Sequence, residues 1–266
     1  MTDKPPILFL HGAFAGPEIW TRFVAPWFTA RGHRVAAPRL PGPVEGEPRL
    51  RDYVRRARQA AEAFGERPVV VGHSLGGFVA QHLAAEGRVA GAVLVASPGP
   101  FGLGPSFMHL ATKAPDVLAA MMIVQAGGGA MIGRDMVRRA LFTEDTPEDW
   151  IASVATYPQR EPVAALIDGM TWNLPVWPLV RRVPILAVTG DADAFVPMSD
   201  LWTIRTLLGA ETEVISGRAH GLPIDPAWKS LAWRINAWLD ERGVGSLPPP
   251  VMWPSLWPAP LGHSAA

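Results

Sequence analysis

Short runs of consecutive apolar residues alternate along the chain with longer stretches in which apolar residues recur every three to four positions. Unbroken apolar runs are typical of parallel strands covered on both faces. The recurrent spacing predicts helices, and the last of them, from 228 to 239, would bury one face. Strands alternating with helices predict an α/β fold with a mainly parallel sheet of about six strands flanked by helices. The predicted strands lie at 6–12, 33–40, 67–72, 89–97, 183–190 and 210–216, and the other helices at 18–32, 50–65, 75–87 and about 199–208.

Residues 99–182 interrupt this alternation with helical, glycine-punctuated sequence and no clear strand. We predict an α/β core at 1–98 and 183–243, with 99–182 inserted as a helical cap. Six of the nine Met residues lie between 108 and 170. Met adapts to irregular contacts, so this bias suits either a lipophilic binding surface or ordinary core filling. The prolines of the tail at 244–266 exclude a helix, which leaves a polyproline-like segment or a strap held by Trp253 and Trp257.

Composition and charge exclude several classes of function. The net charge is zero and the sequence pI is about 7.1, so no basic footprint for nucleic acid is present. The absence of Cys excludes disulfides, thiolate zinc sites and cysteine nucleophiles. The first apolar run is too short for a signal peptide, and no stretch of about 18 apolar residues predicts a membrane span. We therefore expect a cytoplasmic protein, and the oligomeric state stays open.

The candidate chemistry begins where the strand RPVVVG meets the helix that follows it, at Gly72-His73-Ser74-Leu75-Gly76. In G-x-S-x-G the serine occupies a sharp strand-to-helix turn, and the glycines allow the close approach that this turn requires. The following helix N-terminus favours negative charge near the hydroxyl. Ser74 is therefore a candidate nucleophile. The alternative is a tight turn whose serine only caps the helix.

With this context, the chain resembles serine hydrolases of the α/β-hydrolase fold over roughly residues 6–240. His11-Gly12 resembles the "HG" loop that closes the first strand of that family. The resemblance implies an oxyanion hole formed by the backbone N–H groups of Leu75 and of Ala13 or Phe14. Because only six residues precede Ile7, we expect the sheet to lack the N-terminal hairpin usual in the family.

The same resemblance implies a triad acid and base after the nucleophile, in that order. The stretch from Gly190 to Pro197 is similar to the family's G-x-x-D-x-x-V-P signature, which makes Asp193 the expected acid and leaves Asp191 as a turn former or an alternative acid. His220 follows the last predicted strand in an A-H-G loop typical of the family. We predict a Ser74-Asp193-His220 triad.

The resemblance implies a hydrolase that cleaves a carboxylic ester of a small apolar acyl substrate, with no metal or cofactor. Two alternatives remain: hydrolysis of a C–C bond in a diketone by the same triad, and a catalytically silent ligand-binding protein. The residues expected to contact substrate are His73, Phe101, Met108, Met121 and Met122.

Overall fold

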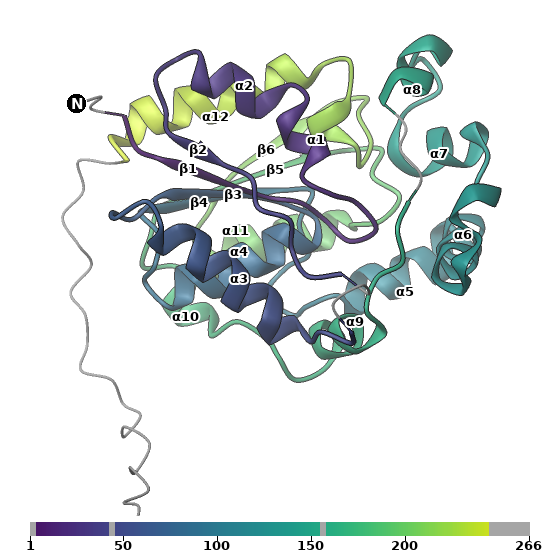
Figure 1. Cartoon of the computed structure of the whole chain (residues 1–266), viewed down its shortest axis with the longest axis horizontal. Coiled ribbons are helices and arrows are strands. Elements are labelled where there is room, and N and C mark those ends of the chain that lie inside the picture. The colour runs from purple at the N-terminus through teal and green to yellow at the C-terminus, as the bar shows by residue number, and fades with distance from the viewer. Residues whose placement is uncertain (1–3, 43–45, 155–157, 245–266) are drawn as a thin grey trace, which may run out of the picture.

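The computed structural model describes residues 4–42, 46–154 and 158–244, and its centre is one parallel sheet (Figure 1). All neighbouring strands pair in parallel, in the order β2-β1-β3-β4-β5-β6. The predicted α/β fold with about six strands is confirmed. The predicted tail at 244–266 lies outside the described residues, apart from Val244. The strands are β1 (Ile7–Leu10), β2 (Val35–Ala36), β3 (Val69–His73), β4 (Gly91–Val95), β5 (Ile185–Gly190) and β6 (Glu211–Ile215).

Successive residues of the central strands point to opposite faces of the sheet and enter two separate cores. Leu8 and Val70 belong to one apolar cluster, whereas Phe9 and Val71 belong to the other. Because both faces are covered by helices, β1, β3, β4 and β5 are buried at every position. The edge strand β6 is only partly buried and carries two Glu residues, a composition that discourages pairing with another chain.

Helices cover each face of the sheet, as Figure 1 shows. The face above the sheet in that view packs against α1 (Glu18–Thr21), α2 (Val24–Thr29) and α12 (Trp228–Arg242). The opposite face packs against α3 (Leu50–Glu62), α4 (Leu75–Ala85), α10 (Trp177–Val180) and α11 (Met198–Leu208).

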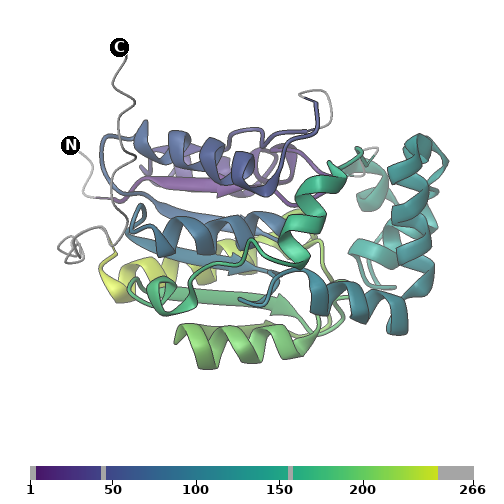
Figure 2. The same ribbon diagram turned by 90° about the horizontal axis from the view of Figure 1, so that it is seen from below.

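The segment between β4 and β5 is helical throughout its described secondary structure. Its first helices form a lobe beyond the ends of the strand arrows (Figure 2). Within the described ranges no single helix is long and apolar enough to cross a membrane; the bent pair Gly104–Lys113 and Pro115–Met131 passes that test jointly. The elements of the segment, besides α10, are α5 (Gly104–Lys113), α6 (Pro115–Ile123), η2 (Val124–Gly128), η3 (Gly129–Met131), α7 (Arg134–Leu141), α8 (Glu148–Val154) and α9 (Val163–Met170).

Two predicted elements differ from the structure, and proline explains both. The single helix predicted over 18–32 is divided into α1 and α2, with Phe23 outside helical geometry. A helix restarting at Val24 places Pro26 in its first turn, where a missing N–H and a rigid ring are tolerated. The strand predicted over 33–40 is reduced to two residues paired with Ile7 and Leu8. Pro38 lies two residues beyond the end of the strand and cannot donate to a sheet ladder.

Candidate active site

Ser74 lies on a sharp turn between β3 and α4 that only glycine neighbours permit. Its backbone has φ 53° and ψ −122°, a conformation that non-glycine residues rarely adopt. A Cβ placed on Gly76 would lie 2.5 Å from the His11 carbonyl oxygen, and one on Gly72 would lie 2.6 Å from the Gly77 nitrogen. The turn is held by a hydrogen bond of 2.9 Å from the Ser74 N–H to the Val95 carbonyl. Backbone strain of this kind is concentrated at functional sites.

Two backbone N–H groups near Ser74 are available to a ligand. Leu75 opens α4 directly after the serine. The loop after β1 approaches from the other side, because a Cβ on Gly12 would lie 3.0 Å from the Ser74 Cβ, and Ala13 follows Gly12. Neither the Ala13 nor the Leu75 N–H donates to a protein acceptor among the described residues. Unpaired donors beside a candidate nucleophile suit an oxyanion that develops there.

Phe14, the alternative to Ala13 as a donor, has its N–H engaged elsewhere. That group donates to Oε2 of Glu161 at 2.8 Å. Of the two alternative donors, Ala13 is therefore the one whose N–H has no acceptor among the described residues. His11 supports the same loop through Nδ1, which donates to the Gly12 carbonyl at 2.9 Å, while its Nε2 accepts from the Leu40 N–H at 2.9 Å.

His220 and Asp193 form a buried hydrogen-bonded pair. His220 Nδ1 lies 2.8 Å from Asp193 Oδ2, and the two side chains are 5% and 2% exposed. The other carboxylate oxygen of Asp193 accepts from the backbone N–H groups of Phe195 at 2.7 Å and Val196 at 3.0 Å. A carboxylate acceptor places the imidazole proton on Nδ1 and leaves Nε2 free to accept one. His220 and Ser74 line the same cavity.

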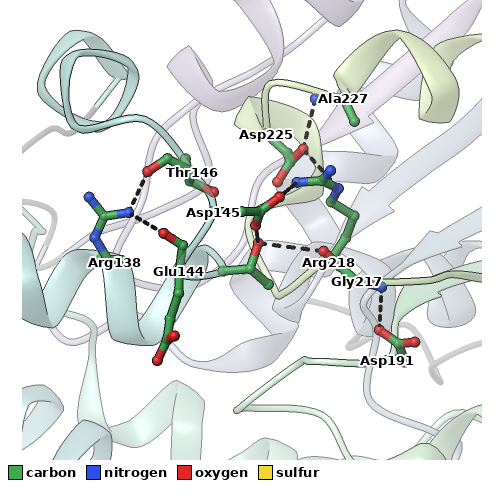
Figure 3. A network of polar contacts seen from close by, with 10 residues as sticks. Arg138, Glu144, Asp145, Thr146, Asp191, Gly217, Arg218, Asp225 and Ala227 are labelled. Carbon is green, nitrogen blue, oxygen red and sulfur yellow. Dashed lines mark hydrogen bonds and ion pairs between the residues drawn. The ribbon is translucent and has the colours of Figure 1, made fainter.

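Asp191, the alternative acid, is exposed, and the carboxylate bonded to His220 is that of Asp193. Its carboxylate accepts from the Ser216 hydroxyl at 2.9 Å. It also accepts from the Gly217 N–H at 2.7 Å, as Figure 3 shows. The hydrogen bond from Ser216, and after it the one from Gly217, lower the pKa of Asp191 below its ordinary value, whereas burial acts in the opposite direction. Asp191 therefore anchors the turn after β6.

The loop that carries His220 is fastened to the segment between β4 and β5. Arg218 lies between two carboxylates, 3.5 Å from Asp145 and 3.8 Å from Asp225 (Figure 3). The Gly221 N–H donates to the Leu141 carbonyl at 2.8 Å. These contacts fix the backbone on both sides of His220.

His73 is buried against the backbone of His220. Its Nε2 donates to the His220 carbonyl at 2.9 Å, and the two ring centroids are 4.7 Å apart. Burial, reinforced by the nearby His220, lowers the pKa of His73 to about 3. A neutral His73 therefore holds the His220 loop in place without adding a charge to the site.

An apolar cavity of about 240 Å³ lies above Ser74, beneath the helices between β4 and β5. Of the predicted substrate contacts, His73 and Met121 line it. Phe101, Met108 and Met122 are 51%, 65% and 63% exposed and are not among the lining residues. The high Met content identified the segment that lines the cavity, but not which side of each helix faces it. The cavity side of α6 and the residue after it follow helical spacing, with Val117, Ala120, Met121 and Val124.

Sequence reasoning missed several wall residues, which come from separate elements. The helical spacing of apolar residues in α6 and α7 could have indicated some of these residues, whereas no sequence pattern indicates the wall residues that lie in loops. No group of three or more His, Cys, Asp or Glu side chains in the described part of the chain could hold a metal ion. The missed wall residues include Leu103, Phe107, Leu110, Met136, Val137, Leu141, Phe142, Leu166, Met170, Phe195 and Ile224.

Comparison with known proteins places the chain in a family. The model of the alpha/beta hydrolase family matches residues 7–232. The chain is 28% identical over 235 residues to a "Pimeloyl-[acyl-carrier protein] methyl ester esterase" of Aromatoleum aromaticum, covering 77% of this chain and 86% of that protein. It is 29% identical over 239 residues to a protein of Oryza sativa subsp. indica named "Probable esterase PIR7A", covering 80% and 89%. Among solved structures, a thermophilic esterase from Thermogutta terrifontis matches with a TM-score of 0.69 at 21% identity, covering 89% of this chain and 90% of that one.

Proposed function

Because the chain belongs to the alpha/beta hydrolase family, we propose that it is a serine carboxylic-ester hydrolase acting on a small molecule with an apolar acyl group. One observation carries the proposal. Ser74, on its strained turn, and His220, which is hydrogen-bonded to the buried Asp193, line one cavity, next to two backbone N–H groups that have no protein acceptor among the described residues. Nucleophile, base, acid and oxyanion donors are the parts that acyl transfer requires.

In the proposed mechanism, Ser74 Oγ attacks the ester carbonyl carbon while His220 Nε2 takes its proton. Asp193 keeps the proton of His220 on Nδ1 and stabilises the imidazolium that forms. The N–H groups of Ala13 and Leu75 stabilise the tetrahedral oxyanion. His220 then protonates the leaving alkoxide, and the acyl-enzyme is hydrolysed by a water molecule that His220 activates in the same way.

The cavity wall supports an apolar acyl group. Apart from the two histidines, Glu18 and Arg22 are the ionisable side chains that line it among the described residues. At about 30 Å³ for a group the size of a water molecule, a volume of 240 Å³ accommodates an acyl chain of about eight such groups. We therefore expect medium-chain esters to be preferred.

Hydrolysis of nitrophenyl esters from acetate to palmitate tests the proposal, with wild type and Ser74→Ala compared side by side. We expect turnover with an optimum at medium chain length, and loss of turnover in the variant. Equal activity of the two proteins would refute the role of Ser74. If no ester were cleaved but a fluorophosphonate still labelled Ser74, the ester proposal would fail and a diketone substrate would be tested next.

A further inference from the structure

The backbone of Phe14 is hydrogen-bonded, through both its N–H and its carbonyl, to a short stretch of the segment between β4 and β5. Its backbone φ of 60° lies in the left-handed region. The Phe14 N–H donates to Glu161 Oε2 at 2.8 Å, and its carbonyl accepts from the Gln159 N–H at 3.1 Å. Left-handed geometry is costly for a residue with a Cβ and persists where the surroundings enforce it. Residues 159–161 provide that enforcement.

The carboxyl group of Glu161 is itself held in place. Glu161 is 7% exposed, and its Oε1 accepts a hydrogen bond from the Tyr53 hydroxyl of α3. The side-chain amide of Gln125 pairs with the Glu161 backbone, donating to its carbonyl at 2.5 Å and accepting from its N–H at 3.1 Å. Both the backbone and the carboxyl of Glu161 are therefore fixed, so the acceptor that it presents to Phe14 has a defined position.

Burial of the Glu161 carboxyl group costs folding free energy. Burial raises the pKa of Glu161 to about 7, and the hydrogen bonds from Tyr53 and Phe14 reduce that effect without cancelling it. A buried carboxyl normally destabilises the fold relative to an apolar residue. The mechanism proposed above leaves Glu161 unused, although it contacts the residue directly after Ala13.

Resting on the proposed function, we propose that Glu161 is a positioning residue that fixes the oxyanion loop through the Phe14 backbone. The Phe14 N–H belongs to the peptide unit that follows the Ala13 Cα, and the Ala13 N–H belongs to the unit that precedes it. Holding the Phe14 unit in place therefore restricts rotation about the two backbone bonds of Ala13, which would otherwise let the Ala13 N–H change direction. Oxyanion donors stabilise the transition state only when they are preorganised. Displacements of about 1 Å are enough to slow a reaction by about 10²-fold.

A matched control is available on the same segment. Asp168 of α9 is also a buried carboxylate, 4% exposed, and also fastens the segment to α3, through Arg49 Nε at 3.0 Å and the Leu50 N–H at 3.3 Å. Within the described ranges, the Asp168 carboxylate makes no hydrogen bond or ion pair with the loop after β1. Removing Asp168 tests the effect of loosening the segment, whereas removing Glu161 also releases Phe14.

The experiment measures the second-order rate at which a fluorophosphonate labels Ser74, with kcat and KM for a nitrophenyl ester measured in parallel. We expect Glu161→Ala to slow labelling by about 10- to 100-fold and to lower kcat more than it raises KM. Glu161→Gln keeps an oxygen that can accept from Phe14 and should stay within about threefold of wild type. Asp168→Ala should stay within the same range. Glu161→Asp, which cannot reach as far, should be intermediate and provides a second test if the Ala variant does not fold.

The outcomes separate the two proposals. Wild-type labelling at Ser74 without ester turnover overturns the ester substrate but leaves the comparison of variants valid. No labelling of the wild type overturns both proposals. Folded Glu161→Ala or Glu161→Asp protein that labels as fast as wild type overturns the role of Glu161, and so does an equal loss in Asp168→Ala.

Discussion

Substitution of Asp193 by Asn preserves the shape of the side chain but exchanges one hydrogen-bond acceptor for a donor. The structure dictates which atom is exchanged. One carboxylate oxygen accepts from the Phe195 and Val196 N–H groups, and the other faces His220 Nδ1. An Asn in the opposite orientation would leave two buried N–H groups unpaired, at about 1–3 kcal/mol each. The amide oxygen will therefore face the backbone, and the NH₂ group will face His220.

This orientation inverts the tautomer of His220. Because the Asn NH₂ can only donate, Nδ1 must accept, and the ring proton moves to Nε2, which can then no longer accept the proton of Ser74. An inverted tautomer in a Ser-His-Asp triad lowers kcat by about 10⁴-fold, equivalent to about 5.4 kcal/mol. The fold should be retained, since the two backbone hydrogen bonds are kept.

Initial rates of nitrophenyl ester hydrolysis by wild type, Asp193→Asn and Asp191→Asn provide the assay, with circular dichroism to verify folding. Asp191 is the matched control, because it is exposed and its carboxylate is hydrogen-bonded to the turn after β6. Asp191→Asn should remain within about threefold of wild type. The reasoning would be refuted if Asp193→Asn retained more than a tenth of the wild-type rate, or if Asp191→Asn were the more damaged protein.

Three further predictions concern stability and specificity. Burial favours the protonated form of Glu161, so the stability that this group contributes to the fold is fully present below pH 4.5 and is lost as the pH rises through about 7. In urea denaturation, the free energy of unfolding of the wild type should therefore fall by up to about 3 kcal/mol relative to that of Glu161→Gln between pH 4.5 and 8. Gly76→Ala places a Cβ 2.5 Å from the His11 carbonyl and should destabilise the fold by more than about 3 kcal/mol in the same assay, whereas Gly133→Ala, with open space around it, should be nearly neutral. Met121→Trp should shift the acyl-chain optimum to shorter esters, and Met122→Trp, on the exposed face, should leave it unchanged.

The core of the fold was predictable because it depends on local sequence patterns. Parallel strands covered on both faces must be apolar throughout, and the runs containing Val69–His73 and Ile185–Gly190 satisfy that condition. The turn at Ser74 was predictable because glycine is required on both sides of it. These features are specified by neighbours in sequence and therefore leave a signature there.

The remaining features depend on contacts between distant residues. Glu161 lies 147 positions from Phe14, and nothing near either residue in the sequence announces their hydrogen bond. Met121 and Met122 are chemically equivalent, and only the packing of α6 decides which one faces the cavity. Composition could locate the segment that covers the site, but assigning its individual contacts required the helix orientations.

The loop that carries His220 and the loop after β1 are both held by the segment between β4 and β5. The loop that carries His220 is tied to the segment between β4 and β5 through Leu141 and Asp145, and the loop after β1 is tied to it through Glu161. Close packing leaves little freedom at the first tie, since a Cβ on Gly221 would lie 2.7 Å from the Leu141 carbonyl oxygen. The same segment forms much of the cavity wall. A substitution that reshapes the proposed acyl site is therefore transmitted to the backbone around the proposed base and oxyanion donors, so that changes in specificity within this segment should alter kcat together with KM.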